Sequence, residues 1–136
     1  MKLPEHAVLR RIVQDWLHKA DLDLRAAETL LAQNPPLLYP SCFHAQQAAE
    51  KYLKAFLTSR QVEFPKTHDI REILRLAATA DQALVANLQA AATLTPYAVE
   101  ARYPGQAPDP CRAEADQALD LARKVRDAVI YRLREI

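Results

Sequence analysis

Four polar side chains with anion-binding chemistry recur along one segment, between Ser41 and Arg60, that the sequence predicts to be an α-helix. At about 100° of rotation per residue, they share a narrow stripe of this helix, opposite a side rich in alanine and aromatic residues. The four are His44, Gln47, Lys51 and Lys54. Lysine ammonium groups bind phosphate as point charges, and an imidazole near the start of a helix adds a donor. The stripe predicts a binding site for a nucleotide phosphate or an acidic partner; the alternatives are a solvated face and a polar dimer interface.

Further binding candidates lie outside this helix. His68 comes just before a predicted helix start, where it could bind a ligand or simply donate to the backbone of the connector. Arg102 and the rings of Tyr97 and Tyr103 form a combination that could clamp a phosphate and stack a base. The alternative is structural, because Tyr103 followed by Pro104 could lock the next loop against the helices. These four residues join the binding candidates, and no residue is assigned as catalytic.

One basic residue falls where a charge is costly. Arg126 lies inside the predicted apolar stripe of the last helix, so it needs a partner of opposite charge. Glu50 and Asp23 are the expected partners. We therefore predict a structural ion pair among Asp23, Glu50 and Arg126.

The elements that would position these residues are all helices. Apolar residues at helical spacing predict helices over residues 4–33, 41–60, 70–79 and 109–134, with a further helix after residue 81 that Pro96 either kinks or divides. Ser41 and Asp69 are the expected N-caps of the second and third helices. Short connectors favour an all-α fold, an antiparallel up-and-down bundle of four long helices plus a short one. A length of 136 residues suits a single domain over residues 1–136.

Composition excludes several classes of protein. Gly105 is the single glycine, whereas Walker and dinucleotide-binding loops need several. A net charge of +1 gives no global attraction for nucleic acid, and no apolar run is long enough to cross a membrane. Cys42 and Cys111 lack metal-ligand spacing and no pair of Glu-x-x-His motifs is present, so neither a metal nor a cofactor is expected. The N-terminus has no apolar leader, so we expect a cytoplasmic protein with reduced thiols.

Three motifs, taken in order, resemble the HEPN domain family. They are Trp16-Leu17-x-x-Ala20-x-x-Asp23-Leu24-x-x-Ala27; Cys42-Phe43-His44-x-x-Gln47-Ala48-x-Glu50-Lys51-x-x-Lys54-Ala55 followed by Thr67-His68-Asp69-Ile70; and Ala101-Arg102-Tyr103-Pro104-Gly105. The resemblance implies a helical bundle, often a homodimer. It also implies frequent pairing with a small, separately encoded nucleotidyltransferase in prokaryotic toxin–antitoxin or related systems. The family name reflects a proposed role in nucleotide binding.

Many members of that family are metal-independent RNases with an Arg and a His separated by four to six residues, near the start of a late helix. The corresponding region here, from Arg102 to Arg112, contains no His. The formal match of Arg11 with His18 lies inside the first predicted helix, on the face opposite the Trp16 stripe. The departure from the signature favours a chain without RNase activity.

Three functions follow from these observations. The first is a binding subunit that presents the stripe around His44 or the Arg102 region to a nucleotide or to a nucleotidyltransferase partner. The second is an RNase toxin that uses His44 or His68 across a dimer. The third is a helical adaptor without a ligand.

Overall fold

All regular structure in the described part of the chain is helical, as the sequence predicts. The computed structural model describes residues 5–99, 104–105 and 108–134. The elements are α1 (His6–Leu31), α2 (Leu38–Ser59), α3 (Ile70–Ala80), α4 (Gln82–Ala86), the 3₁₀ helix η1 (Gln89–Ala98) and α5 (Arg112–Leu133). Three of these helices are long, where the sequence predicted four. The segment after Asp81 is divided at Asn87, where α4 ends, and Pro96 lies inside the 3₁₀ helix that follows.

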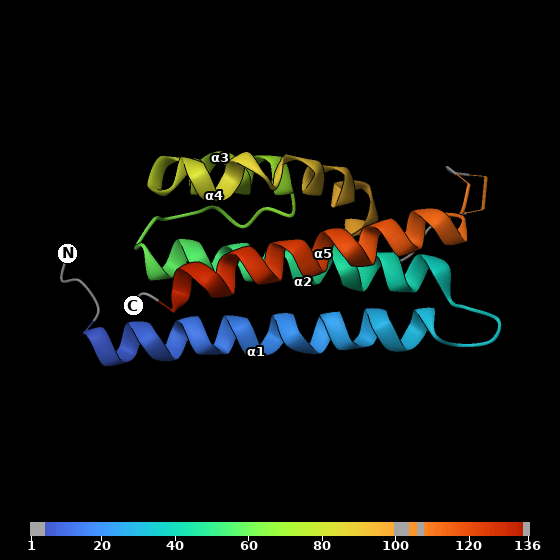
Figure 1. The fold of residues 1–136 in the computed structure, drawn as a ribbon, viewed down its shortest axis with the longest axis horizontal. Helices are drawn as coiled ribbons and strands as arrows, with labels where there is room; N and C mark the ends of the chain where they lie inside the picture. The colour runs from blue at the N-terminus through green and yellow to red at the C-terminus, as the bar shows by residue number, and fades with distance from the viewer. Residues whose placement is uncertain (1–4, 100–103, 106–107, 135–136) are drawn as a thin grey trace.

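The helices form layers around α2 (Figure 1). α1 and α2 run antiparallel along the length of the molecule, and α5 lies beside α2 and runs in the same direction (Figure 1). The shorter helices α3, α4 and η1 cover the side of α2 and α5 that faces away from α1 (Figure 1). Among the described residues, no helix is both long and apolar enough to span a bilayer.

The periodicity of α1 predicts its buried face correctly. The residues of α1 that lie in the core are Val13, Leu17, Ala20, Leu24, Ala27 and Leu31. Trp16, which the sequence placed on the same face, is only half-buried and packs at the edge of the core. This face contacts α2 along its whole length, so α1 is a helix with one buried and one solvated side.

Burial around α2 differs from the expectation of an apolar side and a solvated side. Other helices surround α2, and its buried residues include the polar Gln46, Glu50 and Lys54, which are 0%, 2% and 7% exposed. Lys54 was predicted on a stripe remote from the core and is instead inside it. A helix enclosed by several neighbours must bury polar residues as well as apolar ones, and each buried polar group then needs a hydrogen-bond partner.

The ends of α2 are set by two local features. α2 begins at Leu38, three residues earlier than predicted, because Pro40 fits the first turn of a helix, where its missing N–H has no intrahelical acceptor. Ser41 is therefore not the N-cap; its hydroxyl donates to the Ala27 carbonyl of α1 at 2.8 Å. At the other end, Gln61 adopts a left-handed φ of 56° and α2 closes in a Schellman motif, with Val62 N bonded to Leu57 O at 2.9 Å.

The connector between α2 and α3 leads into a capped helix. Asp69 is the N-cap of α3, as predicted, and its side chain accepts a hydrogen bond from Arg71 N at 3.0 Å. The preceding residues 62–68 have no regular structure. This connector carries His68 and runs against α2, where the candidate site lies (Figure 1).

Candidate functional site

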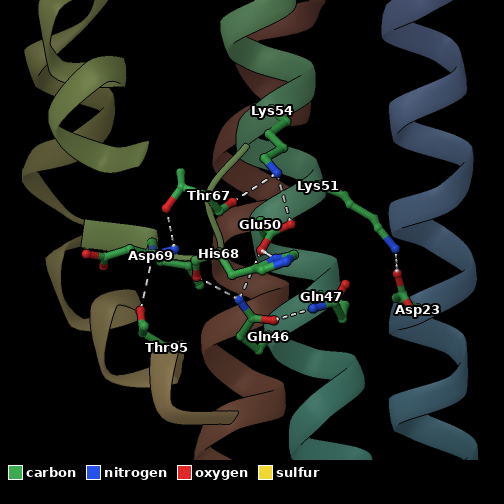
Figure 2. Close-up of polar contacts among 11 residues, drawn as sticks. Asp23, Gln46, Gln47, Glu50, Lys51, Lys54, Thr67, His68, Asp69 and Thr95 are labelled. Carbon is green, nitrogen blue, oxygen red and sulfur yellow. Dashed lines mark hydrogen bonds and ion pairs between the residues drawn. The ribbon is translucent and has the colours of Figure 1, made fainter. Parts of the chain in front are cut away.

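The carboxylate of Glu50 is the centre of a buried polar cluster. Its side chain is 3% exposed, so its charge requires partners. Oε2 accepts from Lys54 Nζ at 3.1 Å, and Oε1 lies 2.8 Å from His68 Nδ1 and 3.3 Å from Gln46 Nε2 (Figure 2). The ammonium of Lys54 balances the carboxylate charge, and the remaining lone pairs of Glu50 are occupied by an imidazole and an amide.

The same side chains of α2 hold the connector in place. Lys54 Nζ donates to the Thr67 carbonyl at 3.1 Å, and Gln46 Nε2 donates to the His68 carbonyl at 3.2 Å (Figure 2). Gln46 Oε1 in turn accepts from Gln47 Nε2 at 2.7 Å. Lys54 is therefore committed to the interior, and its ammonium is not available as a point charge for a phosphate.

A second carboxylate links α1 to α2. Asp23 of α1 has a side chain 13% exposed. Its Oδ1 lies 2.9 Å from His44 Nδ1, and its Oδ2 accepts from Lys51 Nζ at 2.5 Å. His44 and Lys51 lie about two helical turns apart on the same side of α2, so a single carboxylate fixes both of them toward α1.

An aromatic pair continues this region along α1. The rings of Trp16 and Phe64 meet edge to face with centroids 6.3 Å apart. Lys54 Nζ lies 5.7 Å from the Trp16 ring centre and 5.8 Å from the Phe64 ring centre, within cation–π range. The half-buried Trp16 also lines an open cleft of about 220 Å³ with Ile12, Asp15 and Lys19.

These groups form one surface, which we call the α1–α2 face. On α1, its residues recur at helical spacing and so lie on one side of that helix. The α1–α2 face consists of Ile12, Trp16, Lys19 and Asp23 of α1 and His44, Gln47 and Lys51 of α2, with His68 of the connector beside them. The His68 ring points from the connector onto α2 (Figure 2).

The predicted binding residues therefore separate into groups. His44, Gln47, Lys51 and His68 gather at the α1–α2 face, whereas Lys54 lies beneath it. Tyr97 lies elsewhere: it packs edge to face on Tyr39 at 6.0 Å and lines a cleft between η1 and α5. Arg102 and Tyr103 lie outside the described residues.

The predicted pairing of Arg126 with Glu50 or Asp23 is wrong. Arg126 Nε lies 2.9 Å from Asp127 Oδ1, and its side chain is 35% exposed. Both expected partners are satisfied by cations of α2. The long stem of Arg126 explains the difference, because it crosses the apolar stripe and brings the guanidinium to the surface.

Two other contacts between distant parts of the chain have no signal in the sequence. Arg132 of α5 lies 2.6 Å from Asp81, and the Tyr52 hydroxyl donates to Asp21 at 2.5 Å. Burial, followed by the acceptor Asp21, raises the pKa of Tyr52. The pKa of Asp81 is lowered, first by the backbone N–H of Leu84 and then by Arg132. Each contact joins residues far apart in the sequence, and no local pattern predicts such a pair.

The described residues contain no preformed set of side chains that could bind a metal ion. Within residues 5–99, 104–105 and 108–134, no three His, Cys, Asp or Glu side chains come together as metal ligands. The histidines and carboxylates of the two clusters bind one another instead. The arrangement offers an open surface with two imidazoles held by carboxylates, an ammonium and an aromatic edge.

Comparisons with known proteins agree with this architecture. The crystal structure of TT1696 from Thermus thermophilus is 34% identical, with a TM-score of 0.70 over 88% of this chain and 96% of that one. The crystal structure of ST0689, an archaeal HEPN homologue, is 25% identical, with a TM-score of 0.66 over the same shares of each chain. No curated protein gives a significant match. The model of the HEPN domain matches residues 13–135, and the chain belongs to the HEPN domain family.

Proposed function

We propose that this HEPN-domain chain is the binding subunit of a two-component system and docks a separately encoded nucleotidyltransferase on its α1–α2 face. The observation that supports this most directly is the fixed arrangement of that face. Asp23 holds His44 and Lys51, and Glu50 holds His68, each through contacts of 2.9 Å or less. A surface whose side chains are already ordered loses little conformational entropy when a partner docks.

The balance of charge favours a protein partner over a free nucleotide. Lys51 is paired with Asp23, and Lys54 is paired with Glu50. A polyphosphate would have to compete with these carboxylates for the same ammonium groups, because neither lysine is an unpaired point charge. A partner protein gains instead from the mixed polar surface and from apolar contacts beside it. Nucleotide binding stays a prediction, tested by titrating the isolated chain with nucleotides.

Trp16 is the side chain on this face best suited to anchor a partner. It is half-buried, so part of its ring is fixed by the protein and part is open to solvent beside Ile12 and Lys19. Tryptophan is enriched among the residues that carry most of the binding energy of protein interfaces. We therefore place the centre of the docking site at Trp16 and its polar rim at Lys51 and His68.

The test is capture of the partner by the tagged chain from native-host lysate, with identification by mass spectrometry. We expect a stoichiometric nucleotidyltransferase. Trp16→Ala should weaken its binding by about 30-fold, the effect of truncating an interface anchor by ~2 kcal/mol. Lys19→Glu, an exposed variant that leaves the core intact, should also weaken it. Arg25→Ala, on the opposite side of α1, is the matched control and should bind as wild type does.

Two results would overturn the proposal. One is a folded bait that recovers no nucleotidyltransferase. The other is unchanged binding by both Trp16→Ala and Lys19→Glu, which would move the partner away from this face. Homodimerisation and a toxin–antitoxin role, implied by the family resemblance, stay predictions to be tested by light scattering and by growth on expression with and without the partner. An RNase remains the alternative function, with RNA cleavage lost in His44→Ala or His68→Ala as its signature.

A further inference from the structure

The imidazole of His68 combines exposure with a buried anchor. Its side chain is 68% exposed, yet Nδ1 lies 2.8 Å from Glu50 Oε1, whose side chain is 3% exposed. The two ring nitrogens are therefore in different environments. Nδ1 is turned to the buried carboxylate, and Nε2 is the other ring nitrogen of this largely exposed side chain.

The surrounding hydrogen bonds fix which nitrogen carries the proton. The carboxylate of Glu50 only accepts, so Nδ1 must donate to it. The Gln46 amide is oriented by two acceptors, since Nε2 donates both to Glu50 Oε1 and to the His68 carbonyl. Lys54 Nζ donates to the other carboxylate oxygen, Oε2, so both oxygens of Glu50 act as acceptors. In the neutral ring, the proton is on Nδ1 and the lone pair is on Nε2, in a side chain that is 68% exposed.

We propose that His68 Nε2 is a nucleophile that accepts a phosphoryl group from an activated phosphoryl donor of the N-phosphoryl or acyl-phosphate class. In this step the Nε2 lone pair forms a bond to phosphorus. The bond from phosphorus to the leaving nitrogen or oxygen breaks, and its electron pair departs with the leaving group. The Nδ1 proton stays in its hydrogen bond to Glu50, and no oxidant or reductant is needed.

Glu50 assists because attack through Nε2 places positive charge on the ring. A buried carboxylate 2.8 Å from Nδ1 stabilises that charge more than it stabilises the neutral ring. The exposure of the His68 side chain also suits an acceptor of a phosphoryl group. A catalytic base for a small substrate is normally enclosed, whereas an acceptor must enter the donor site of another molecule. The proposal does not depend on which partner docks at the α1–α2 face.

The test uses the purified full chain and potassium phosphoramidate, with the site of modification mapped by mass spectrometry under alkaline conditions. His6 and His18, exposed histidines of α1, are internal controls. We expect His68 to be phosphorylated about ten-fold faster than either control, which corresponds to ~1.4 kcal/mol of transition-state stabilisation. Glu50→Gln should reduce the His68 rate to that of the controls, and the controls should not change.

A second measurement, which does not require Glu50→Gln to fold, uses the wild-type chain alone. Two-bond ¹H–¹⁵N spectra of the wild-type chain report the tautomer of the neutral His68 ring directly. A proton on Nδ1 is expected. A proton on Nε2, or a His68 phosphorylation rate equal to that of His6 and His18, would overturn the proposal.

Discussion

The ammonium of Lys54 offers the sharpest test of the buried cluster. Lys54→Met keeps the length of the side chain and its packing against Trp16, and removes only the charged donor. Two contacts are lost, each of 3.1 Å: one to Glu50 Oε2 and one to the Thr67 carbonyl. The carboxylate of Glu50, 3% exposed, then keeps only the His68 ring and the Gln46 amide as partners.

The expected loss follows from this geometry. Removing one member of a buried ion pair costs about 3–5 kcal/mol. Because Glu50 retains its contacts with His68 and Gln46, we expect the lower limit, about 3 kcal/mol. For a chain of 136 residues, an unfolding entropy of about 2.1 cal/mol/K per residue converts this into a fall in Tm of roughly 10 °C.

Lys51→Met is the matched control. Lys51 is also paired, but its side chain is 23% exposed and its partner Asp23 keeps His44. A loss of about 1 kcal/mol or less, or roughly 3 °C, is therefore expected. The assay is thermal and urea unfolding followed by circular dichroism at neutral pH. Equal losses in the two variants would refute the reasoning that Lys54 compensates a buried charge. The double change Glu50→Leu with Lys54→Met should recover part of the loss, because it leaves no unpaired charge.

Three further outcomes are expected. The pKa of Asp81 is lowered in the folded state, first by the Leu84 N–H. Ionised Asp81 therefore stabilises the fold above its unfolded-state pKa, near pH ~4, and this stabilisation is lost as the pH falls through the folded-state pKa. Below about pH 5, Tm should accordingly fall less steeply in Asp81→Asn than in wild type. Burial raises the pKa of Cys42 to about 11, so Ellman's reagent should titrate the exposed Cys111 quickly and Cys42 only after denaturation. Gln61→Gly, at a φ of 56°, should raise the stability by up to ~1 kcal/mol in urea unfolding.

The sequence predicts the buried residues of the outer helix α1 well, because one side of this helix packs on the core and the other side faces solvent. In α1, an apolar residue recurs at each turn from Val13 to Leu31, and these residues are the buried ones. Asp69 similarly marks the start of α3, because a capping carboxylate acts on its own helix within two residues. Such features depend on local spacing alone, which one sequence contains in full.

The same reasoning fails for α2, whose environment is set by the rest of the chain. Its predicted polar stripe looks like a solvated face, but Lys54 contacts a connector that returns 13 residues later. Glu50 and Gln46 bind the same connector, 18 and 22 residues away in the sequence. The sequence predicts Glu50 or Asp23 as the partner of Arg126, because charge alone does not distinguish one possible partner from another. The position of Asp23, 21 residues before His44, depends on how α1 packs on α2. Residue types therefore indicated which side chains matter, and tertiary packing determined their partners.

The attachment of the connector to α2 has a consequence for which substitutions this fold tolerates. Lys54 and Gln46 bind the carbonyl oxygens of Thr67 and His68, which every amino acid possesses. These two hydrogen bonds therefore require particular side chains at positions 46 and 54 of α2, but they require none on the connector. A library randomised at position 67 should retain folded variants of many kinds, whereas one randomised at position 54 should retain few. Position 67 can therefore change its side chain while α2 continues to hold the path of the connector, whereas His68 is constrained by its own contact with Glu50.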